Sequence, residues 1–410
     1  MAVNKIELSL KEVLKQSIID LKYVDDYSLD QIVIEIPKDK AHGDYSSNIA
    51  MQLTKVLKRN PREIAQEIID AIDKDKGNID HVEIAGPGFI NLFLKKDAMT
   101  SIIKEVLDEQ DHYGMSDFGQ GVKYNVEFVS ANPTGDLHLG HAKGAAVGDS
   151  ICRIMSAAGY DVSREYYIND AGNQITNLSI SLYARYLQSF GIEKELPEDG
   201  YYGKDIIDIA QKIKQQVNDQ FVNADETEAL AYFRKVGTEF ELDKIKDILK
   251  EYGVVFDVWF SESSLYDENK VEPTIQKLKD KGYTYESEGA LWFRSTDFDD
   301  DKDRVLIKSD GSYTYLTPDI AYHLNKLDRG YEYLVDLLGA DHHGYINRMK
   351  AAIQALGYNA DQLNIDIMQM VRMVENGEVV KMSKRTGNAV TIKDLIDDIG
   401  VDATRYFFVS

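Results

Sequence analysis

The sequence predicts an α/β protein built around a parallel β-sheet, with a small α+β unit before it and a helical insertion within it. Three observations support this prediction: strand-like and helix-like segments alternate after residue 123, a shorter mixed unit precedes them, and a strongly charged helical stretch interrupts the alternation. The 410 residues are 43% hydrophobic and 29% charged, which is typical of globular chains and excludes collagenous or wholly disordered ones.

Charge and cysteine content narrow the class of protein further. The net charge of −23 argues against a surface that wraps nucleic acid, although a local basic surface on an acidic body is compatible with it. No run of about 18 apolar residues occurs, so we expect no membrane span. Cys152 is the only cysteine, which excludes an intrachain disulfide and a cysteine-rich metal site and fits a reducing, cytoplasmic location.

We expect the first domain, of α+β type, to cover residues 1–118. Its predicted elements are helices at 6–21, at 46–57 and after Pro61, and strands at 32–36, 81–85 and 89–94. Gly86-Pro87-Gly88 is a turn signal between the last two strands. Residues 111–121 combine several glycines with little apolar content, so we expect the linker between the domains there.

The second domain is expected to cover residues 119–410. A strand at 124–130, a helix at 138–158 and a strand at 161–168 form a βαβ unit, the building block of a parallel sheet. Residues 190–252 are strongly charged and helical, and we interpret them as an insertion. The strand–helix alternation then resumes in four segments, 305–316, 319–327, 334–338 and 346–356. Residues 368–380 alternate around Asn376-Gly377 and predict a hairpin, and residues 375–410 hold a lysine-bearing loop and the start of a helical region.

The most informative motif is His138-Leu139-Gly140-His141, at the turn between a predicted strand and a predicted helix. A helix N-terminus offers unpaired N–H groups and the positive end of the helix dipole, both of which suit a phosphate. Gly140 lets a nucleotide lie against the backbone, and two imidazoles can donate hydrogen bonds to a phosphate whose charge grows in the transition state. The alternative is a pair of histidines that only cap or pack the start of the helix.

A second motif, Lys381-Met382-Ser383-Lys384, lies in a polar loop after the predicted hairpin. Lysine ammonium groups are compact charges on flexible stems, so such a loop can close over a triphosphate. The alternative is an ordinary basic surface loop.

Together and in this order, the two motifs resemble the HIGH and KMSKS signatures of class I aminoacyl-tRNA synthetases. Their flanks resemble arginyl-tRNA synthetases in particular. The matching stretches are VEFVSANPTG at 126–135, YIND at 167–170, FDVWFSE at 256–262, YLTPDIA at 315–321, GADHH at 339–343, AHGDY at 41–45 and GPGFIN at 86–91. The resemblance implies a Rossmann-like class I catalytic domain and a tRNA-contacting N-terminal domain. It also implies an enzyme that activates L-arginine with ATP to arginyl-adenylate and transfers the arginyl group to tRNA(Arg).

Arginine is a planar cation with five hydrogen-bond donors and no acceptor, so its pocket needs carboxylates and an aromatic or hydroxyl wall. The arginine-binding residues that the resemblance implies are Glu127, Ser130, Asn132, Glu262, Tyr315 and Asp319. We assign Glu262 and Asp319 to the guanidinium, with Tyr315 beside them, and the other three to the α-amino and carboxylate end. The alternatives are a solvated loop position for Glu262 and a core position for Tyr315. Unpaired carboxylates would reject neutral amino acids, so we expect no editing domain.

For ATP, the resemblance implies three groups of residues. The phosphates and nucleoside are assigned to His138, Gly140 and His141, and the ribose and adenine to Gly339, Asp341 and His342. The departing pyrophosphate is assigned to Lys381 and Lys384, and Ser383 of the same motif is counted with the ATP-binding residues. The predicted catalytic residues are His138, His141, Lys381 and Lys384. Mg²⁺ is expected with the triphosphate as part of the substrate complex, and no cluster of histidines and cysteines predicts a protein-bound metal.

Phe89, Asn91 and Phe93 on one predicted strand are the candidates for tRNA contact through stacking and an amide, with core packing as the alternative for Phe93. Asp136 departs from the family pattern, where Pro is more frequent, and its charge should face away from the phosphate. The family continues into a helical anticodon-binding domain, which we expect to be absent from this chain, with reduced affinity for tRNA as the result. We expect a monomer that does not bind membranes.

Two other functions are weighed against this interpretation. The first is an enzyme of the wider HxGH nucleotidyltransferase superfamily that adenylates a different small molecule, which would not need the three acids Glu127, Glu262 and Asp319. The second is a synthetase-like paralogue that binds RNA without catalysis. Such a paralogue is expected to lose histidines or lysines from the two motifs, and all four are present here.

Overall fold

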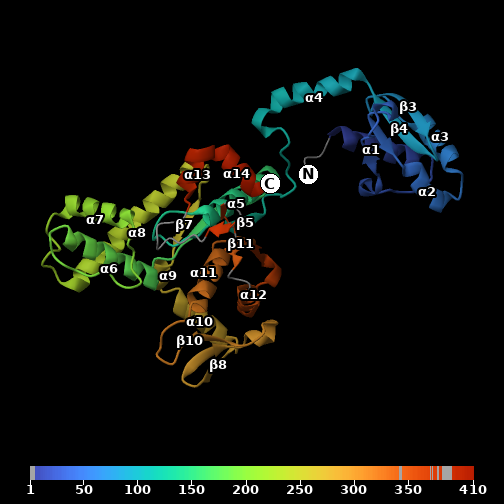
Figure 1. Ribbon diagram of the computed structural model, residues 1–410. Helices are drawn as coiled ribbons and strands as arrows, with labels where there is room; N and C mark the ends of the chain where they lie inside the picture. Colours follow the sequence, from blue (N-terminus) through green and yellow to red (C-terminus); the bar gives the residue numbers. More distant parts are fainter. Residues whose placement is uncertain (1–4, 341–343, 370, 372, 376–377, 381–389) are drawn as a thin grey trace. The chain divides into compact units, whose positions relative to one another are not determined.

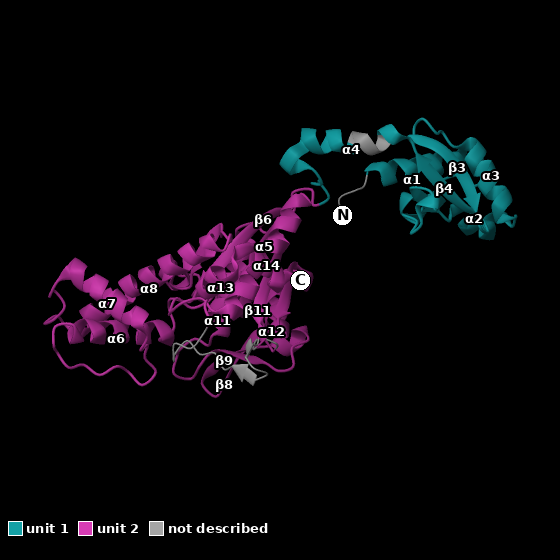
Figure 2. Ribbon diagram, turned by 45° about the horizontal axis from the view of Figure 1, so that its top comes forward, with its two compact units in different colours: residues 1–118 teal, residues 119–410 magenta. Residues whose placement is uncertain are grey.

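The computed structural model describes residues 5–340, 344–369, 371, 373–375, 378–380 and 390–410, and its course is drawn in Figure 1. The chain divides into two compact units, residues 1–118 and residues 119–410, which Figure 2 colours separately. Among the residues that the structure describes, every helix is too short or too polar to span a bilayer.

The first unit packs helices on one antiparallel sheet. Its four strands lie in the order β1-β2-β4-β3, with bounds Ile34–Glu35, Tyr45–Ser47, Phe89–Leu94 and Ile79–Ala85. Its helices are α1 (Lys5–Asp20), α2 (Ile49–Leu57), α3 (Pro61–Ala71) and α4 (Lys96–Glu109). A single apolar core of aliphatic side chains, including Leu14, Leu53, Ile68 and Leu92, holds α1, α2 and α3 against the sheet.

The start of α2 differs from the sequence-based expectation. A helix was expected from residue 46, but residues Tyr45–Ser47 form a strand that pairs with both β1 and β4. The Ser47 hydroxyl donates a hydrogen bond to the carbonyl of Val33 at 2.8 Å, which ties this segment to the sheet. The helix therefore begins only after Asn48.

The second unit contains a five-stranded parallel sheet in the order β12-β11-β5-β6-β7. The strands span Leu363–Met368, Tyr333–Gly339, Lys123–Glu127, Asp161–Ile168 and Val258–Ser261. From β5 the chain builds outward through β6 and β7, and it later returns to the other side of β5 to add β11 and β12. The direction of winding thus reverses between β5 and β11, and in open α/β sheets ligands bind at the carboxyl ends of the strands at such a point.

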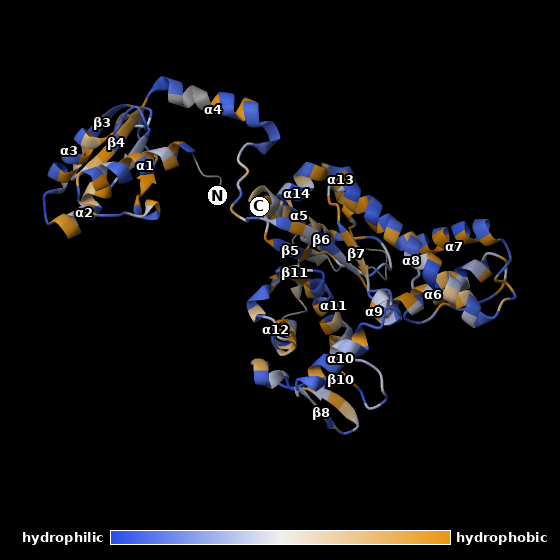
Figure 3. Ribbon diagram, turned by 180° about the vertical axis from the view of Figure 1, so that it is seen from behind, coloured by the Kyte–Doolittle hydropathy of each residue, from blue (hydrophilic) through white to orange (hydrophobic). Residues whose placement is uncertain are grey.

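Helices cover both faces of this sheet, because alternate residues of each strand point to opposite sides. Val335 and Leu337 of β11 pack in one apolar cluster with Ala145 of α5 (Leu139–Ala157). Leu334 and Leu338 pack in a second cluster with α11 (Leu316–Asp328), α12 (Tyr345–Leu356) and α10 (Val271–Asp280). The hydropathy of these elements can be followed in Figure 3.

The remaining elements modify this plan. The charged stretch expected at 190–252 holds α7 (Lys204–Val217) and α8 (Glu226–Glu251), and both contact α6 (Asn173–Gln188), which begins before it. The segment 305–316 was expected to continue the strand–helix alternation, but its strand β10 (Arg304–Ile307) forms a three-stranded antiparallel sheet with β8 (Thr284–Ser287) and β9 (Ala290–Phe293), which were not predicted. β13 (Met373–Glu375) and β14 (Glu378–Val380) pair antiparallel as the hairpin prediction requires, while the turn residues Asn376 and Gly377 lie outside the described residues. Two short helices, α13 (Ile392–Ile399) and α14 (Val401–Val409), follow.

The contact between α5 and β5 yields a stability prediction. A methyl group at Gly148 of α5 would come within 2.4 Å of the Phe128 ring, whereas at Gly144 of the same helix it would meet nothing within 4 Å. We expect Gly148→Ala to lower the free energy of unfolding by about 1–3 kcal/mol through overpacking. Gly144→Ala, the matched control, should raise it by roughly 0.5–1 kcal/mol because alanine favours helix. Urea unfolding followed by circular dichroism measures both, and equal effects of the two variants would contradict the close packing.

Candidate active site

The chain leaves β5 through a strained turn. Val129 and Ser130 have φ angles of 67° and 39°, in the left-handed region that a β-branched residue such as valine rarely adopts. The Ser130 hydroxyl stabilises this turn, because it donates to Oε1 of Glu127 at 3.0 Å and accepts from the backbone N–H of Tyr167 at 3.0 Å. Asn132 follows, and its side-chain amide donates to Gln174 at 2.8 Å. The turn therefore fixes Ser130 and Asn132 at the carboxyl end of β5.

The two histidines form the N-terminus of α5. Nδ1 of His138 accepts the backbone N–H of Gly140 at 3.1 Å, and Nδ1 of His141 accepts the backbone N–H of His138 at 3.1 Å. The rings stack with their centroids 3.8 Å apart. A nitrogen that accepts a hydrogen bond carries no proton, so this geometry leaves the ring proton of both residues on Nε2. Each imidazole is thereby set to act as a donor through Nε2, which is the role that a phosphate requires.

The lysine motif itself is not described, but Val390, further along the chain, has a defined place. Lys381, Ser383 and Lys384 lie outside the described residues, as do Asp341 and His342. The backbone of Val390 accepts the N–H of Leu139 at 3.0 Å, and the N–H of Ile392 donates to the carbonyl of Leu137 at 2.8 Å. Val390 and Ile392 are therefore attached to the segment that carries the two histidines.

Two of the three predicted acids, Glu262 and Asp319, lie near each other among tyrosine hydroxyls and are called the acid pair below. Glu262, at the start of α9 (Ser263–Asp267), is 8% exposed and accepts hydrogen bonds from Tyr167 and Tyr266. Asp319 lies in the first turn of α11 and accepts a hydrogen bond from Tyr345. Burial raises the pKa of Glu262, and burial together with the charges of Glu262 and Glu127 raises the pKa of Asp319 to about 7. Such carboxylates are destabilised when ionised and unpaired, so the acid pair favours a bound cation.

Asp170 holds the turn that carries Glu262. Its carboxylate accepts the backbone N–H of Ser263 at 2.9 Å and the hydroxyl of Ser261 at 2.5 Å. The backbone N–H of Glu262 in turn donates to Ile168 at 2.9 Å, at the end of β6. The position of Glu262 is therefore set by β6 and not by a flexible loop.

Tyr315 is not among the tyrosines that donate hydrogen bonds to the acid pair. Its side chain is 78% exposed, and it makes no hydrogen bond among the described residues. It lies one helical turn before Asp319, at the N-cap of α11, so its backbone is at the rim of the site. The hydroxyls beside Glu262 and Asp319 come instead from Tyr167, Tyr266 and Tyr345, which the sequence analysis did not single out.

Glu127 belongs to a row of buried acids across three strands. Asp336 of β11 is the register partner of Glu127 in β5, and Glu127 is the register partner of Glu165 in β6. All three side chains are nearly inaccessible to solvent. Their alternation with Val335, Val126 and Tyr166, which pack towards α5, places them on the face covered by α11. Like charges directly opposite each other in a sheet repel, so this row requires cations.

Helix α11 supplies those cations. Nζ of Lys326, which is 0% exposed, donates to Glu127 at 2.6 Å and to Asp336 at 2.9 Å. Arg329 donates to both oxygens of Glu165 at 2.7 and 2.8 Å, and Nε2 of His323 lies 2.7 Å from Asp336. A further hydroxyl, that of Tyr322, lies 2.8 Å from Glu127 and 3.0 Å from Glu165. The carboxylate of Glu127 is thus occupied by protein donors on both of its oxygens.

The remaining predicted site residues, one for ATP and three for tRNA, have the following positions. Gly339 ends β11, at the carboxyl edge of the sheet. In the first unit, Phe89 and Phe93 are half-buried, and the Phe93 ring stacks on His81 with centroids 4.1 Å apart. Asn91 is 4% exposed and its Oδ1 accepts the Ser46 hydroxyl at 2.8 Å, so its amide is not presented at the surface. The part of the chain that the structure describes holds no group of three or more His, Cys, Asp or Glu suited to a metal ion.

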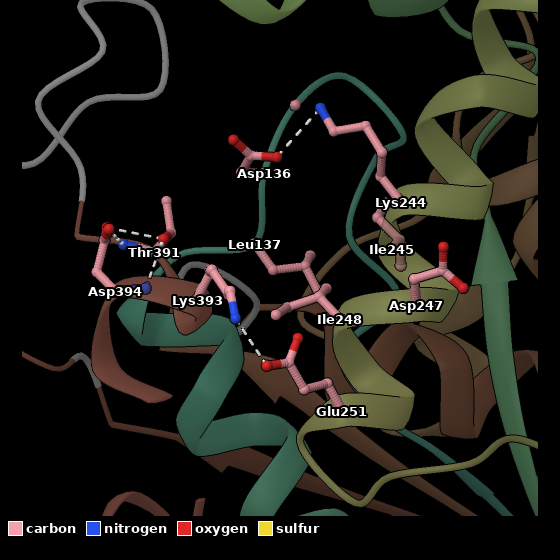
Figure 4. Close-up of a pocket in the computed structure, with 11 residues that line it drawn as sticks. Asp136, Leu137, Lys244, Ile245, Asp247, Ile248, Glu251, Thr391, Lys393 and Asp394 are labelled. Atoms are coloured by element: carbon pink, nitrogen blue, oxygen red, sulfur yellow. Dashed lines mark hydrogen bonds and ion pairs between the residues drawn. The ribbon is translucent and has the colours of Figure 1, made fainter. Parts of the chain in front are cut away.

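A cavity of about 480 Å³ lies next to the segment that leads into His138, but it is lined by none of the predicted binding residues. Its walls come from residues 135–137, from α8 and from the start of α13 (Figure 4). Asp136 pairs there with Lys244 at 3.1 Å, so its charge is neutralised by α8. The cavity is therefore a space behind the histidine turn and not the candidate site.

The sequence contained signals for some of the residues that were missed. Asp336 interrupts an otherwise apolar strand, and Lys326 and His323 stand among apolar residues of α11. Buried charged residues are almost always paired, so these three positions together could have indicated an ion network. Tyr167 lies in the matching stretch at 167–170, but Tyr266 and Tyr345 carried no comparable signal, since tyrosine is also common in protein cores.

Comparisons with known proteins show the family to which the chain belongs. A model of the arginyl tRNA synthetase N terminal domain family matches residues 8–94, and a model of the catalytic domain of class I (R) tRNA synthetases matches residues 102–406. The arginine–tRNA ligase of Bacillus velezensis is 56% identical over 97% of this chain and 72% of its own length. That of Listeria monocytogenes is 56% identical over 98% of this chain and 72% of its own length.

Solved structures show the same fold. A structure from Campylobacter jejuni matches 77% of this chain and 68% of its own chain, with a TM-score of 0.70 and 38% identity. The arginyl-tRNA synthetase of Thermus thermophilus matches 98% of this chain and 73% of its own chain with a TM-score of 0.60, at 18% identity.

The ion network leads to a prediction on stability. Lys326→Met leaves Glu127 and Asp336 buried without their shared cation, so we expect the free energy of unfolding to fall by about 3–5 kcal/mol. Lys393→Met is the control, because Lys393 pairs with Glu251 at the protein surface and should contribute little. Urea titration of both variants is the measurement. A Lys326→Met variant as stable as Lys393→Met would show that the network does not hold the sheet.

Proposed function

The chain belongs to the arginyl-tRNA synthetases, the class I arginine–tRNA ligases, and from this premise we propose how its residues divide the reaction between them. The enzyme uses ATP to join arginine to tRNA. The observation that carries our proposal is the mutual proximity of Glu262 and Asp319, whose carboxylates accept hydrogen bonds from tyrosine hydroxyls.

We assign the guanidinium of arginine to Glu262 and Asp319. Two carboxylates can accept the planar fork of donors that distinguishes arginine from lysine, whose ammonium is a compact point charge. The hydroxyls of Tyr167, Tyr266 and Tyr345 orient these carboxylates, and Tyr315 at the rim can cover the bound side chain. A neutral amino acid would leave both acids unpaired, which supports discrimination without editing.

The other end of arginine is assigned to Ser130, Asn132 and Glu127. These three residues belong to the end of β5 and the turn after it, and Glu127 is paired with Lys326. Because protein donors already occupy the Glu127 carboxylate, we propose that Glu127 acts on the α-amino group mainly through its charge and through Ser130. This assignment leaves the arginine carboxylate directed towards the N-terminus of α5.

ATP is assigned to the edge of the sheet beside α5. His138 and His141 would donate from Nε2 to the phosphates, and Gly140 would let the nucleoside approach the backbone. Gly339, with Asp341 and His342, would hold the ribose and adenine, and Lys381, Ser383 and Lys384 the pyrophosphate. Mg²⁺ would enter with ATP, bound by phosphate oxygens and water.

In this scheme the chemistry is two displacements without a covalent enzyme intermediate. A carboxylate oxygen of arginine attacks the α-phosphorus, the bond to the bridging oxygen breaks, and pyrophosphate leaves with its electron pair. A ribose hydroxyl at the 3′ end of tRNA then attacks the arginyl carbonyl and loses its proton, and AMP leaves. The residues of this chain supply position and charge stabilisation.

Several further expectations are kept as proposals. Phe89, Asn91 and Phe93 are the candidates for tRNA contact, and Asn91 would have to turn outwards to reach a base. A monomeric state and a cytoplasmic location are likewise predictions, as is the division into a tRNA-contacting domain at 1–118 and a catalytic domain at 119–410.

The affinity for arginine should depend on pH. The pKa of Asp319 is about 7 without ligand, and a guanidinium binds its ionised form, so arginine binding should release protons and tighten as pH rises. Between pH 6 and pH 8 we expect the Kd to fall about tenfold. Calorimetry in phosphate and in Tris buffer measures both the Kd and the protons released. A Kd that stays constant across this range, with no proton release, would contradict the assignment.

The histidine roles are tested by pyrophosphate exchange. We expect arginine-dependent ATP–pyrophosphate exchange, measured with tRNA(Arg) present, to fall about 10²–10³-fold in His138→Ala, because one transition-state donor is lost. Exposed His112, outside the site, is replaced by Ala as the control and should leave the rate unchanged. Full exchange in His138→Ala would rule out its phosphate role, and exchange supported by lysine but not by arginine would overturn the substrate assignment.

A further inference from the structure

His323 is a buried histidine behind the arginine site that the reaction scheme does not use. It lies on α11, one turn after Asp319, and is 3% exposed. Its Nδ1 lies 2.7 Å from the backbone carbonyl oxygen of Asp319, and its Nε2 lies 2.7 Å from a carboxylate oxygen of Asp336 on β11. The ring therefore joins the first turn of the helix to the central sheet.

The partners of the ring determine its protonation state. A carbonyl oxygen can only accept a hydrogen bond, and so can an ionised carboxylate, so both ring nitrogens must donate. Asp336 is ionised because Lys326 donates to its other oxygen at 2.9 Å. Although burial alone would raise the pKa of Asp336, the charges of Lys326 and His323 hold it well below its usual range. His323 is consequently an imidazolium ion within the protein.

We propose that His323 is a positioning residue for the arginine site, whose imidazolium fixes the first turn of α11 to β11 and places a positive charge behind the Asp319 carboxylate. The proposal rests on the assignment of Asp319 to the guanidinium. It adds a residue that sets how strongly Asp319 attracts arginine at neutral pH without touching the substrate.

The surroundings of Asp319 explain why such a charge matters. Glu262, Glu127 and the burial of the site all disfavour the ionised form of Asp319, whereas His323 favours it. The hydroxyls near Asp319 and Glu262 come from Tyr345 on α12, Tyr167 on β6 and Tyr266 of α9. The groups that face His323 itself are Asp336, Lys326 and Tyr322. Without the imidazolium, Asp319 would hold its proton to a higher pH and would be neutral in more molecules at pH 7.

The test replaces His323 by glutamine, whose amide can still donate to Asp336 but carries no charge. Thr317→Val is the matched control, since it removes one buried hydrogen bond, from Thr317 to the Leu306 carbonyl, in the same turn of α11. For both variants and the wild type, calorimetry gives the Kd for arginine from pH 6 to pH 9 and the Kd for ATP, and thermal unfolding gives the Tm.

In His323→Gln we expect the pH dependence of the arginine Kd to move up by about one unit, because a neighbouring opposite charge shifts a carboxyl pKa by 1–3. The Kd at pH 7 should then weaken up to about tenfold and recover towards the wild-type value at pH 9, with the ATP Kd unchanged. Thr317→Val should keep the wild-type profile. A loss of equal size at every pH would mean that His323 is only a structural link, and an unchanged profile would mean that its charge does not act on Asp319; either result overturns the proposal.

Two further experiments distinguish a failure of the His323 proposal from a failure of the Asp319 assignment. Asp319→Asn tests the proposed function alone: if it leaves the arginine Kd unchanged, the assignment of Asp319 is wrong whatever His323 does. If His323→Gln does not fold, the wild type is tested with ¹⁵N-labelled histidine. We then expect one imidazole that stays doubly protonated at pH 8, where exposed histidines are neutral, and its absence would overturn the proposal.

Discussion

The row of acids across the central sheet is the constraint on which the rest of this structure depends. Glu127, Glu165 and Asp336 are register neighbours on three parallel strands, and each is removed from water. Such a row can exist only if cations meet it from the covering helix, and Lys326, Arg329 and His323 do so. The pairing fixes α11 on the sheet, and α11 carries Asp319 in its first turn. Stability and substrate recognition therefore share one set of charges.

The sheet topology explains why the two halves of the reaction meet. Because the winding reverses between β5 and β11, the turn after β5, the end of β11 and the N-terminus of α5 open towards the same edge. Acids gather on the side of α11, and helix N–H groups and imidazoles gather at α5. The acid pair, which suits a cation, and the start of α5, which suits an anion, are therefore separate parts of one edge of the sheet.

Much of the fold could be predicted from local pattern, while the site could be predicted only in part. The strands at 161–168 and 89–94 were predicted with their observed bounds, because their apolar residues and flanking turns are unambiguous. β8 and β9 were missed because four-residue strands carry too little periodicity, and the segment at 305–316 was assigned to the parallel sheet although β10 belongs to the small antiparallel one. Glu262 and Asp319 were identified through motifs, whereas the partners of Glu127 depend on strand register and helix placement. Neither of these is encoded within any short stretch of sequence.

The attachment of Val390 beside the histidines has a consequence for how this enzyme can vary. Residues 381–389 are joined to a strand hairpin at one end and to Leu139 at the other. Inserted residues in a closed loop add little free energy, about 0.6 kcal/mol for each doubling of length, but an extended chain covers at most about 3.6 Å per residue. Natural variation should therefore lengthen the chain between Val380 and Val390 more readily than shorten it.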